Sequence, residues 1–205
     1  MDEYNGSAVV AMAGDRCVGI AADRRLGINR FNTISNEFDK CFKVNQQCFV
    51  AFPGLATDVQ TMHKELRFRC NLLLLREDLP WMTPSLVSSL ISSMLYERRF
   101  APFFVSPVVA GLEKDTHKPF LAGFDCIGAA CKAEDFIANG TAKEQLAGIC
   151  EAMWRPKMGE EELLETLSQC LLAGVDRDCV SGWGGVVHVV TPEKIITRLL
   201  KGRMD

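Results

Sequence analysis

Residues 7–25 read SAVVAMAGDRCVGIAADRR, and this stretch indicates how the chain begins to fold. Residues 7–13 and 17–23 are rich in small and β-branched residues, and the turn residues Gly14 and Asp15 lie between them. The pattern therefore predicts two short strands joined by a turn.

The rest of the chain continues with groups of strands and pairs of helices. A helix that begins at Thr83 is the best defined, because Thr83 can cap it and Pro84 suits its first position. Further strands are expected near Thr33–Ser35, Cys41–Val44, Cys48–Phe52, 103–112, 118–128, 135–140, 183–191 and 194–202. Further helices are expected over Leu55–Glu77, Ala142–Ala152 and Glu160–Gly174.

This order of elements favours an α+β fold. Strands do not alternate singly with helices, which disfavours a doubly wound parallel sheet. Two mainly antiparallel sheets packed face to face, with helices outside, would bury the apolar runs on both faces. No linker or repeat divides the sequence, so we expect one domain over residues 1–205, with residues 1–6 as an N-terminal extension.

The helix after Thr83 has a face of small hydroxyl side chains. These are Ser85, Ser88, Ser89, Ser92 and Ser93. Such a face is unusual for open solvent and suits close packing against another subunit; an ordinary exposed surface is the alternative interpretation.

Composition excludes several classes of function. The formal net charge is -3 and the basic residues are scattered, so we expect no nucleic-acid binding. The nine cysteines form no CxxC pair and lie mostly in apolar runs, which indicates reduced core residues rather than zinc ligands or disulfides. No apolar run reaches the ~20 residues of a membrane span. The acidic start MDEYNG is unlike a secretory leader, so an intracellular protein is expected, with no cofactor or metal.

Three segments combine polar side chains with tight glycine turns, and each allows two interpretations. They are Gly6-Ser7 with residues 21–23, Lys40 with residues 53–58, and residues 177–182. Turns, helix caps and surface ion pairs would explain each segment alone. Together, a hydroxyl, a lysine, two aspartates and a glycine amide could supply a nucleophile, its base and an oxyanion donor.

Five motifs carry a resemblance that decides between these interpretations. AADRR (21–25), GLATDVQT (54–61), PVVAGL (107–112), VDRDCVSG (175–182) and the final RMD (203–205) resemble the beta subunits of the eukaryotic 20S proteasome. The resemblance covers nearly the whole chain. It implies the N-terminal-nucleophile hydrolase fold, a four-layer αββα sandwich, which agrees with the order of elements.

The resemblance also implies roles for individual residues. Ser7 falls where active beta subunits have their nucleophilic threonine, and Thr141 falls near a supporting serine. The other matching positions are Asp23, Lys40 (with one residue inserted after Asp23), the oxyanion glycine Gly54, and the supporting residues Asp178 and Ser181.

The departure from the active pattern lies at the nucleophile. An active subunit loses a propeptide, and the freed α-amine, with a pKa near ~8, can then serve as a base. Here a serine replaces the threonine, and with residues 1–6 still attached its nitrogen is an amide. The resemblance thus implies a noncatalytic subunit in which the seven positions are vestigial. The alternative is a weakly active N-terminal-serine peptidase formed if Met1–Gly6 are removed.

The same resemblance implies partners and a location. We expect contacts with other beta subunits within and across the two beta rings and with alpha-ring subunits, in the cytoplasm and nucleus. The loop Leu112–Phe120 could lend Glu113 or Asp115 to a neighbour's specificity pocket, although a plain hairpin turn is the favoured interpretation.

Overall fold

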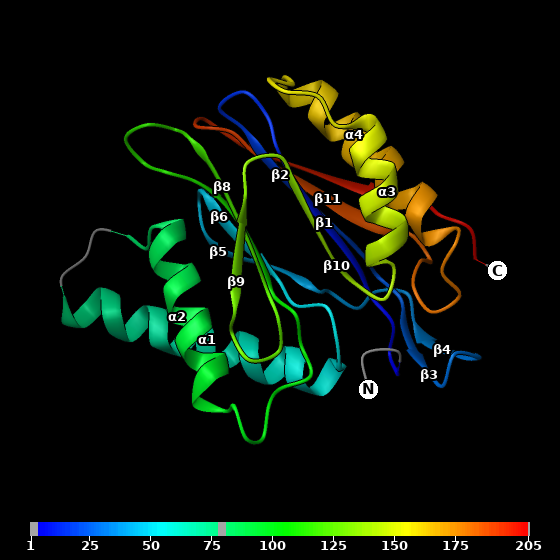
Figure 1. Cartoon of the computed structure of the whole chain (residues 1–205), viewed down its shortest axis with the longest axis horizontal. Helices are drawn as coiled ribbons and strands as arrows, with labels where there is room; N and C mark the ends of the chain where they lie inside the picture. Colours follow the sequence, from blue (N-terminus) through cyan, green and yellow to red (C-terminus); the bar gives the residue numbers. More distant parts are fainter. Residues whose placement is uncertain (1–3, 78–80, 205) are drawn as a thin grey trace.

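The computed structural model describes residues 4–77 and 81–204, which form four layers. Figure 1 shows two sheets packed face to face, with α1 and α2 outside one sheet and α3 and α4 outside the other. The helices are α1 (Ala56–Arg76), α2 (Pro84–Glu97), α3 (Lys143–Met153) and α4 (Glu160–Val175). This arrangement confirms the predicted αββα sandwich.

The first sheet has the strand order β10-β1-β2-β11-β12 and is antiparallel throughout. Its strands are β1 (Ala8–Ala13), β2 (Val18–Asp23), β10 (Phe136–Gly140), β11 (Gly185–Val190) and β12 (Ile195–Leu200). In the register, Val9 lies opposite Ala22 and Gly185 opposite Asp23. The start of β1, the end of β2 and the start of β11 therefore share one end of the sheet.

The second sheet has the order β5-β6-β7-β8-β9 and is also antiparallel. Its strands are β5 (Cys41–Asn45), β6 (Cys48–Ala51), β7 (Val108–Leu112), β8 (Pro119–Phe124) and β9 (Ala130–Ala133). A separate hairpin of β3 (Leu26–Ile28) and β4 (Asn32–Ser35) projects beside the N-terminal segment (Figure 1).

Three apolar clusters fill the spaces between the four layers. The packing of strand β1 explains why apolar and polar residues do not alternate in its sequence. Ala8, Val10 and Met12 pack toward α3 and α4, whereas Val9 and Ala11 pack into the core between the sheets. Because successive side chains point to opposite faces, a strand covered on both sides needs apolar residues at every position.

Local signals explain where α2 and α4 start. The Thr83 side chain accepts a hydrogen bond from Leu86 N at 3.2 Å, and Pro84 is the first residue of α2, as the sequence predicts. Helix α4 begins with three glutamates, whose charges suit the positive end of the helix dipole.

Several local predictions were wrong. The short strands β3 and β9 were not predicted, because few of their residues are buried and their sequences are not apolar runs. Residues 103–107 form no regular strand and contribute only the bridge between Val105 and Gly54. Residues 125–128 form a turn, in which Gly128 N donates to Asp125 O at 3.3 Å.

Part of the serine face of α2 packs against other residues of the same chain. Ser88 is buried, and Ser92 Oγ donates to Gly128 O at 2.7 Å. A side chain at Gly128 would place its Cβ 2.4 Å from Ser92 O, so small residues on both sides permit this approach. Ser85, Ser89 and Ser93 are exposed. Packing against another subunit is therefore not needed to explain Ser88 or Ser92.

Candidate functional site

The structure gathers the predicted site residues at one end of the sandwich. Ser7 precedes β1, Asp23 ends β2 and Lys40 precedes β5. Thr141 follows β10, while Asp178 and Ser181 lie in the loop between α4 and β11. These segments meet at one end of the sandwich, so residues as far as 159 positions apart are in direct contact, as Asp23 and Gly182 show.

Asp23 is the centre of the site. Its side chain is fully buried, and Oδ1 accepts hydrogen bonds from Ala8 N at 2.8 Å and from Lys40 Nζ at 2.7 Å. Its other oxygen, Oδ2, accepts a bond from Gly182 N at 3.2 Å. One carboxylate thus joins β1, β5 and the loop before β11, and its charge is matched by a buried ammonium group.

Lys40 is equally buried, with 2% of its surface exposed. Its Nζ donates to Asp23 Oδ1 and, at 3.0 Å, to the backbone carbonyl of Gly6. Burial lowers the pKa of Lys40, because desolvation disfavours the charged form, while the Asp23 carboxylate acts in the opposite direction. No hydrogen bond joins Lys40 to the Ser7 hydroxyl among the described residues.

A second polar chain connects Ser7 to the loop after α4. Ser7 N–H donates to Thr141 Oγ1 at 3.2 Å, and Thr141 Oγ1 donates its proton to Asp178 Oδ2 at 2.7 Å. Ser181 Oγ donates to the same oxygen at 2.7 Å. The resemblance placed Thr141 near the position of a supporting serine. In the structure, Thr141 contacts both Ser7 and the supporting residue Asp178.

The Ser7 hydroxyl itself is isolated. The residue is 1% exposed, and Oγ has no hydrogen-bond partner among the described residues. It lines a cavity of about 190 Å³ together with Gly54, Asn139 and Lys143. Gly54 has a φ of +132°, and a Cβ there would lie 2.1 Å from Phe104 O, so glycine is required at this position. The predicted nucleophile and oxyanion glycine thus share a cavity.

Sequence reasoning gave no role to three residues that hold this site together, although Gly6 and Arg25 lie in stretches that it singled out. The Asn5 side chain bonds Ala56 N and Gly27 O, and Gly6 supplies the carbonyl that binds Lys40. Arg25 is 3% exposed and donates to Val180 O at 2.6 Å. The only sequence signals are an arginine beside an apolar strand and an asparagine before a glycine, and neither is specific.

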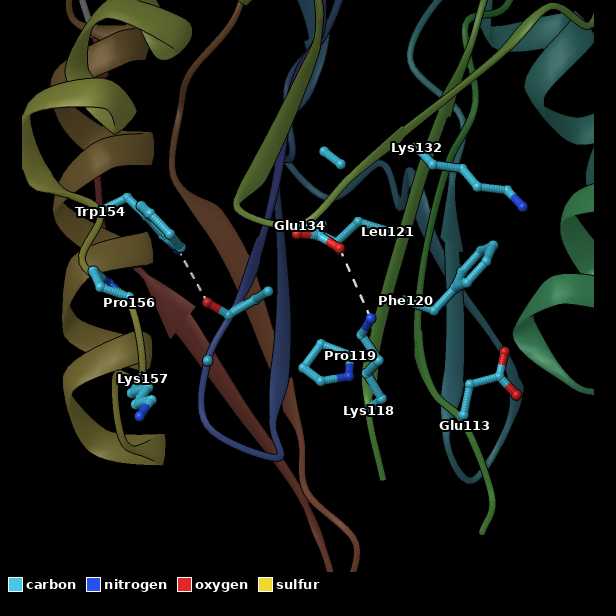
Figure 2. A pocket seen from close by; sticks show the side chains of 13 residues that line it. Glu113, Lys118, Pro119, Phe120, Leu121, Lys132, Glu134, Trp154, Pro156 and Lys157 are labelled. Atoms are coloured by element: carbon cyan, nitrogen blue, oxygen red, sulfur yellow. Dashed lines mark hydrogen bonds and ion pairs between the residues drawn. The ribbon is translucent and has the colours of Figure 1, made fainter. Parts of the chain in front are cut away.

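The largest described cavity, about 700 Å³, lies elsewhere. Figure 2 shows Trp154 and Pro156 on one wall and Lys118, Pro119 and Glu134 opposite, with Trp154 Nε1 bonded to Ala13 O. Ala13 ends β1, whereas Ser7 precedes its first residue. At ~3.3 Å per residue, the strand separates this cavity from Ser7 by roughly 20 Å.

The loop Leu112–Phe120 forms part of that distant wall. Its backbone makes a hairpin turn, in which Glu113 N donates to Lys118 O at 3.0 Å and His117 N donates to Glu113 O at 2.9 Å. Asp115 is exposed and lines none of the described cavities. The favoured hairpin interpretation is therefore what the backbone adopts.

The described ranges hold neither a metal-binding cluster nor a membrane-spanning helix. Within residues 4–77 and 81–204, no group of three or more His, Cys, Asp or Glu side chains is arranged to hold a metal ion. In the same ranges, no helix has the length and apolar character needed to cross a bilayer.

Comparison with known proteins gives a consistent result. The sequence profile described as "Proteasome subunit" matches residues 3–190. The chain is 54% identical over 203 residues to "Proteasome subunit beta type-3-B" of Arabidopsis thaliana, covering 99% of this chain and 98% of the relative. It is 48% identical over 202 residues to "Proteasome subunit beta type-3" of Dictyostelium discoideum, covering 98% of both chains. It is 47% identical over 201 residues to the Saccharomyces cerevisiae protein of the same name, covering 98% of this chain and 97% of the relative.

These matches span the strands, the helices and the site residues alike. They agree with the sandwich fold and with the cluster around Ser7, Asp23 and Lys40. The chain belongs to the proteasome subunit family.

Proposed function

We propose that this chain is a noncatalytic beta subunit of the 20S proteasome core. In this role it completes a beta ring and supports ubiquitin-dependent protein degradation by neighbouring threonine-protease subunits. Support comes from relatives named beta type-3 that are 54%, 48% and 47% identical over nearly the whole chain. A closed ring needs every position filled, so an inert subunit still contributes its interfaces.

One observation carries the noncatalytic assignment. While residues 1–6 stay attached, the Ser7 nitrogen is an amide, and its N–H is donated to Thr141 Oγ1 at 3.2 Å. The lone pair of a peptide nitrogen is delocalised into the carbonyl, so this atom cannot accept the hydroxyl proton. Lys40 Nζ, the other candidate base, is bonded to Asp23 and to Gly6 O instead. In the uncleaved chain, the Ser7 hydroxyl therefore has no proton acceptor among the residues that the structure describes.

A second candidate function rests on the polar residues around Ser7, because all the supporting positions of an active site are occupied. Asp23, Lys40, Asp178 and Ser181 all retain mutual hydrogen bonds or contacts with the Ser7 segment. If residues 1–6 were removed, Ser7 would gain a free amine beside this set. A slow N-terminal-serine peptidase is the activity that such a chain would have.

Intact mass after covalent labelling separates the two candidates. The assembled particle would be treated with a peptide epoxyketone, which bonds both the hydroxyl and the free amine of an N-terminal threonine or serine. We expect this chain to remain unmodified and to carry residues preceding Ser7, while the catalytic beta subunits are labelled as internal controls. A modified chain that begins at Ser7 would establish the peptidase instead.

The partners belong to the same proposal. We propose contacts with other beta subunits in the same ring, with subunits of the opposing beta ring and with the alpha ring. Membership of the proteasome subunit family supports assembly with other proteasome subunits. Cross-linking of the intact particle followed by mass spectrometry should give cross-links from this chain to all three groups; cross-links confined to one group would contradict the ring position.

We propose the cytoplasm and nucleus as its location, which is where the assembled particle would act. Fluorescence of a C-terminally tagged chain that co-purifies with the particle should appear in both compartments. Fluorescence confined to a membrane-bounded organelle would contradict this proposal.

A further inference from the structure

Residues 5 and 6, directly before Ser7, are part of the folded structure. Tyr4 is exposed, whereas Asn5 is 7% exposed and Gly6 is buried. Asn5 Oδ1 accepts a hydrogen bond from Ala56 N at 2.9 Å, and Asn5 Nδ2 donates to Gly27 O at 2.8 Å. The Asn5 carbonyl also accepts a bond from Gly27 N at 3.4 Å. Asn5 thus joins β3 to the first residue of α1.

The bond to Ala56 replaces a missing helix cap. The first N–H groups of a helix have no partner inside the helix, and a side-chain oxygen usually satisfies one of them. Leu55, the N-cap residue of α1, makes no side-chain bond. Asn5 supplies the oxygen from 51 residues away. Removal of Asn5 would leave the start of α1 without this partner.

Gly6 is held just as tightly. Its φ is +72°, and a Cβ there would lie 1.8 Å from Val180 O. Arg25 Nη1 donates to that same carbonyl at 2.6 Å. The Gly6 carbonyl accepts the Lys40 ammonium bond at 3.0 Å. The Gly6 carbonyl oxygen and Asp23 Oδ1 both accept from Lys40 Nζ, so this ammonium group is already engaged on two oxygens.

Release of the segment would require a defined reaction. The hydroxyl oxygen at position 7 would bond to the Gly6 carbonyl carbon, and its proton would reach the position-7 nitrogen as the C–N bond breaks. Water would then hydrolyse the resulting ester, leaving a carboxylate on Gly6 and a free amine at position 7. The first step needs a base at the hydroxyl, yet a protonated Lys40 that donates to Gly6 O and Asp23 has no lone pair to offer.

We infer that Asn5 is a positioning residue that keeps residues 1–6 attached. By joining α1 and β3 it holds the Gly6 carbonyl oxygen on the Lys40 ammonium, so that Lys40 is kept from serving the Ser7 hydroxyl as a base. Retention then depends on this anchor and not solely on the absence of threonine at position 7. The inference deepens the proposed noncatalytic function by naming the residue that enforces it.

Three variants of the chain in the assembled particle test the inference. Ser7→Thr restores the usual nucleophile and should leave the segment fully attached. Asn5→Ala combined with Ser7→Thr should yield a detectable fraction of chains that begin at residue 7. The matched control is Asn45→Ala with Ser7→Thr, because the Asn45 side chain also bonds two backbone groups, at Met82 O and Gln47 N, outside this site. The control should behave as Ser7→Thr does, and intact mass reads all three.

Hydrogen exchange supplies a readout that does not depend on cleavage. Exchange at the Ala56 amide should rise at least tenfold in the Asn5→Ala variant and stay unchanged in the Asn45→Ala control. Efficient cleavage of Ser7→Thr alone would overturn the inference. Complete retention in the double variant, or unchanged exchange at Ala56, would overturn it too.

A second variant covers the case in which the Asn5→Ala chain fails to assemble, and failure of the inference can be told apart from failure of the proposed function. If the Asn5→Ala chain does not assemble, Asn5→Asp combined with Ser7→Thr keeps the acceptor for Ala56 N–H and loses the donor to Gly27. The same mass criterion applies to it. A failure of the proposed function would be seen in a different sample. In that case the unsubstituted chain would begin at Ser7 and would be modified by the epoxyketone.

Discussion

At the scale of single residues, the buried pair of Asp23 and Lys40 organises the site. Their side chains are 0% and 3% exposed and lie 2.7 Å apart. Such a pair contributes little net stability over an apolar replacement of both partners, but removing one partner leaves an uncompensated buried charge. This asymmetry gives the two residues a structural role that needs no catalysis.

We predict that Lys40→Met lowers the free energy of unfolding by about 3–5 kcal/mol, because the Asp23 carboxylate loses its counter-charge. Urea unfolding of the purified chain measures this change. Lys43→Met is the matched control, since Lys43 is an exposed lysine bonded to Gln46, and it should stay within about 0.5 kcal/mol. Equal effects of the two substitutions would show that the buried charge pair has no special role.

At the scale of elements, β11 contains an ionisable residue where its neighbours are apolar. His188 stacks on Phe49 of β6 with ring centroids 4.6 Å apart, and its Nδ1 lies 2.9 Å from Thr197 Oγ1 of β12. Burial lowers the pKa of His188, and the Asp39 carboxylate acts weakly in the opposite direction. The contact between the two sheets therefore favours the neutral imidazole.

This shift predicts how stability depends on pH. An unfolded histidine has a pKa near 6.5, so between the lowered folded value and ~6.5 the unfolded chain binds more protons. The free energy of unfolding should therefore fall as pH falls below ~6.5. His188→Gln should flatten this dependence in urea unfolding at pH 5.5 and 7.5, although His63, whose pKa burial also lowers, retains part of it. An unchanged slope in His188→Gln would contradict the assignment.

At the scale of the whole molecule, three apolar cores hold the four layers together. Leu167 of α4 shows how closely the layers approach. A Cβ placed on Gly19 of β2 would lie 2.1 Å from Leu167 Cδ1, so the leucine packs directly onto the strand backbone. The helix layer is thus fitted to the sheet by a glycine opposite a large side chain.

We predict that Leu167→Ala lowers the free energy of unfolding by about 2–5 kcal/mol, because it leaves a cavity in a closed core. Leu199 of β12 is 68% exposed, so Leu199→Ala should change the purified chain by less than about 0.5 kcal/mol. Chemical unfolding of both variants gives the comparison. A small loss for Leu167→Ala would mean that α4 is loosely attached to the sheet.

The sequence by itself indicated the layered class, because strands that are apolar at every position must be covered on both faces, and the helices come in pairs that can cover them. It also determined the family motifs, which place Ser7, Asp23 and Lys40 in one site. Strands β3 and β9 escaped prediction because their pairing depends on partners in space rather than on local composition.

Only the tertiary structure decided which groups satisfy one another. Nothing near Asn5 in the chain indicates that its side chain caps a helix that starts at Ala56, or that Gly6 O faces Lys40. Hydrogen bonds between residues distant in sequence depend on how the strand ends converge, and that geometry follows from packing. The isolation of the Ser7 hydroxyl is a consequence of the same packing.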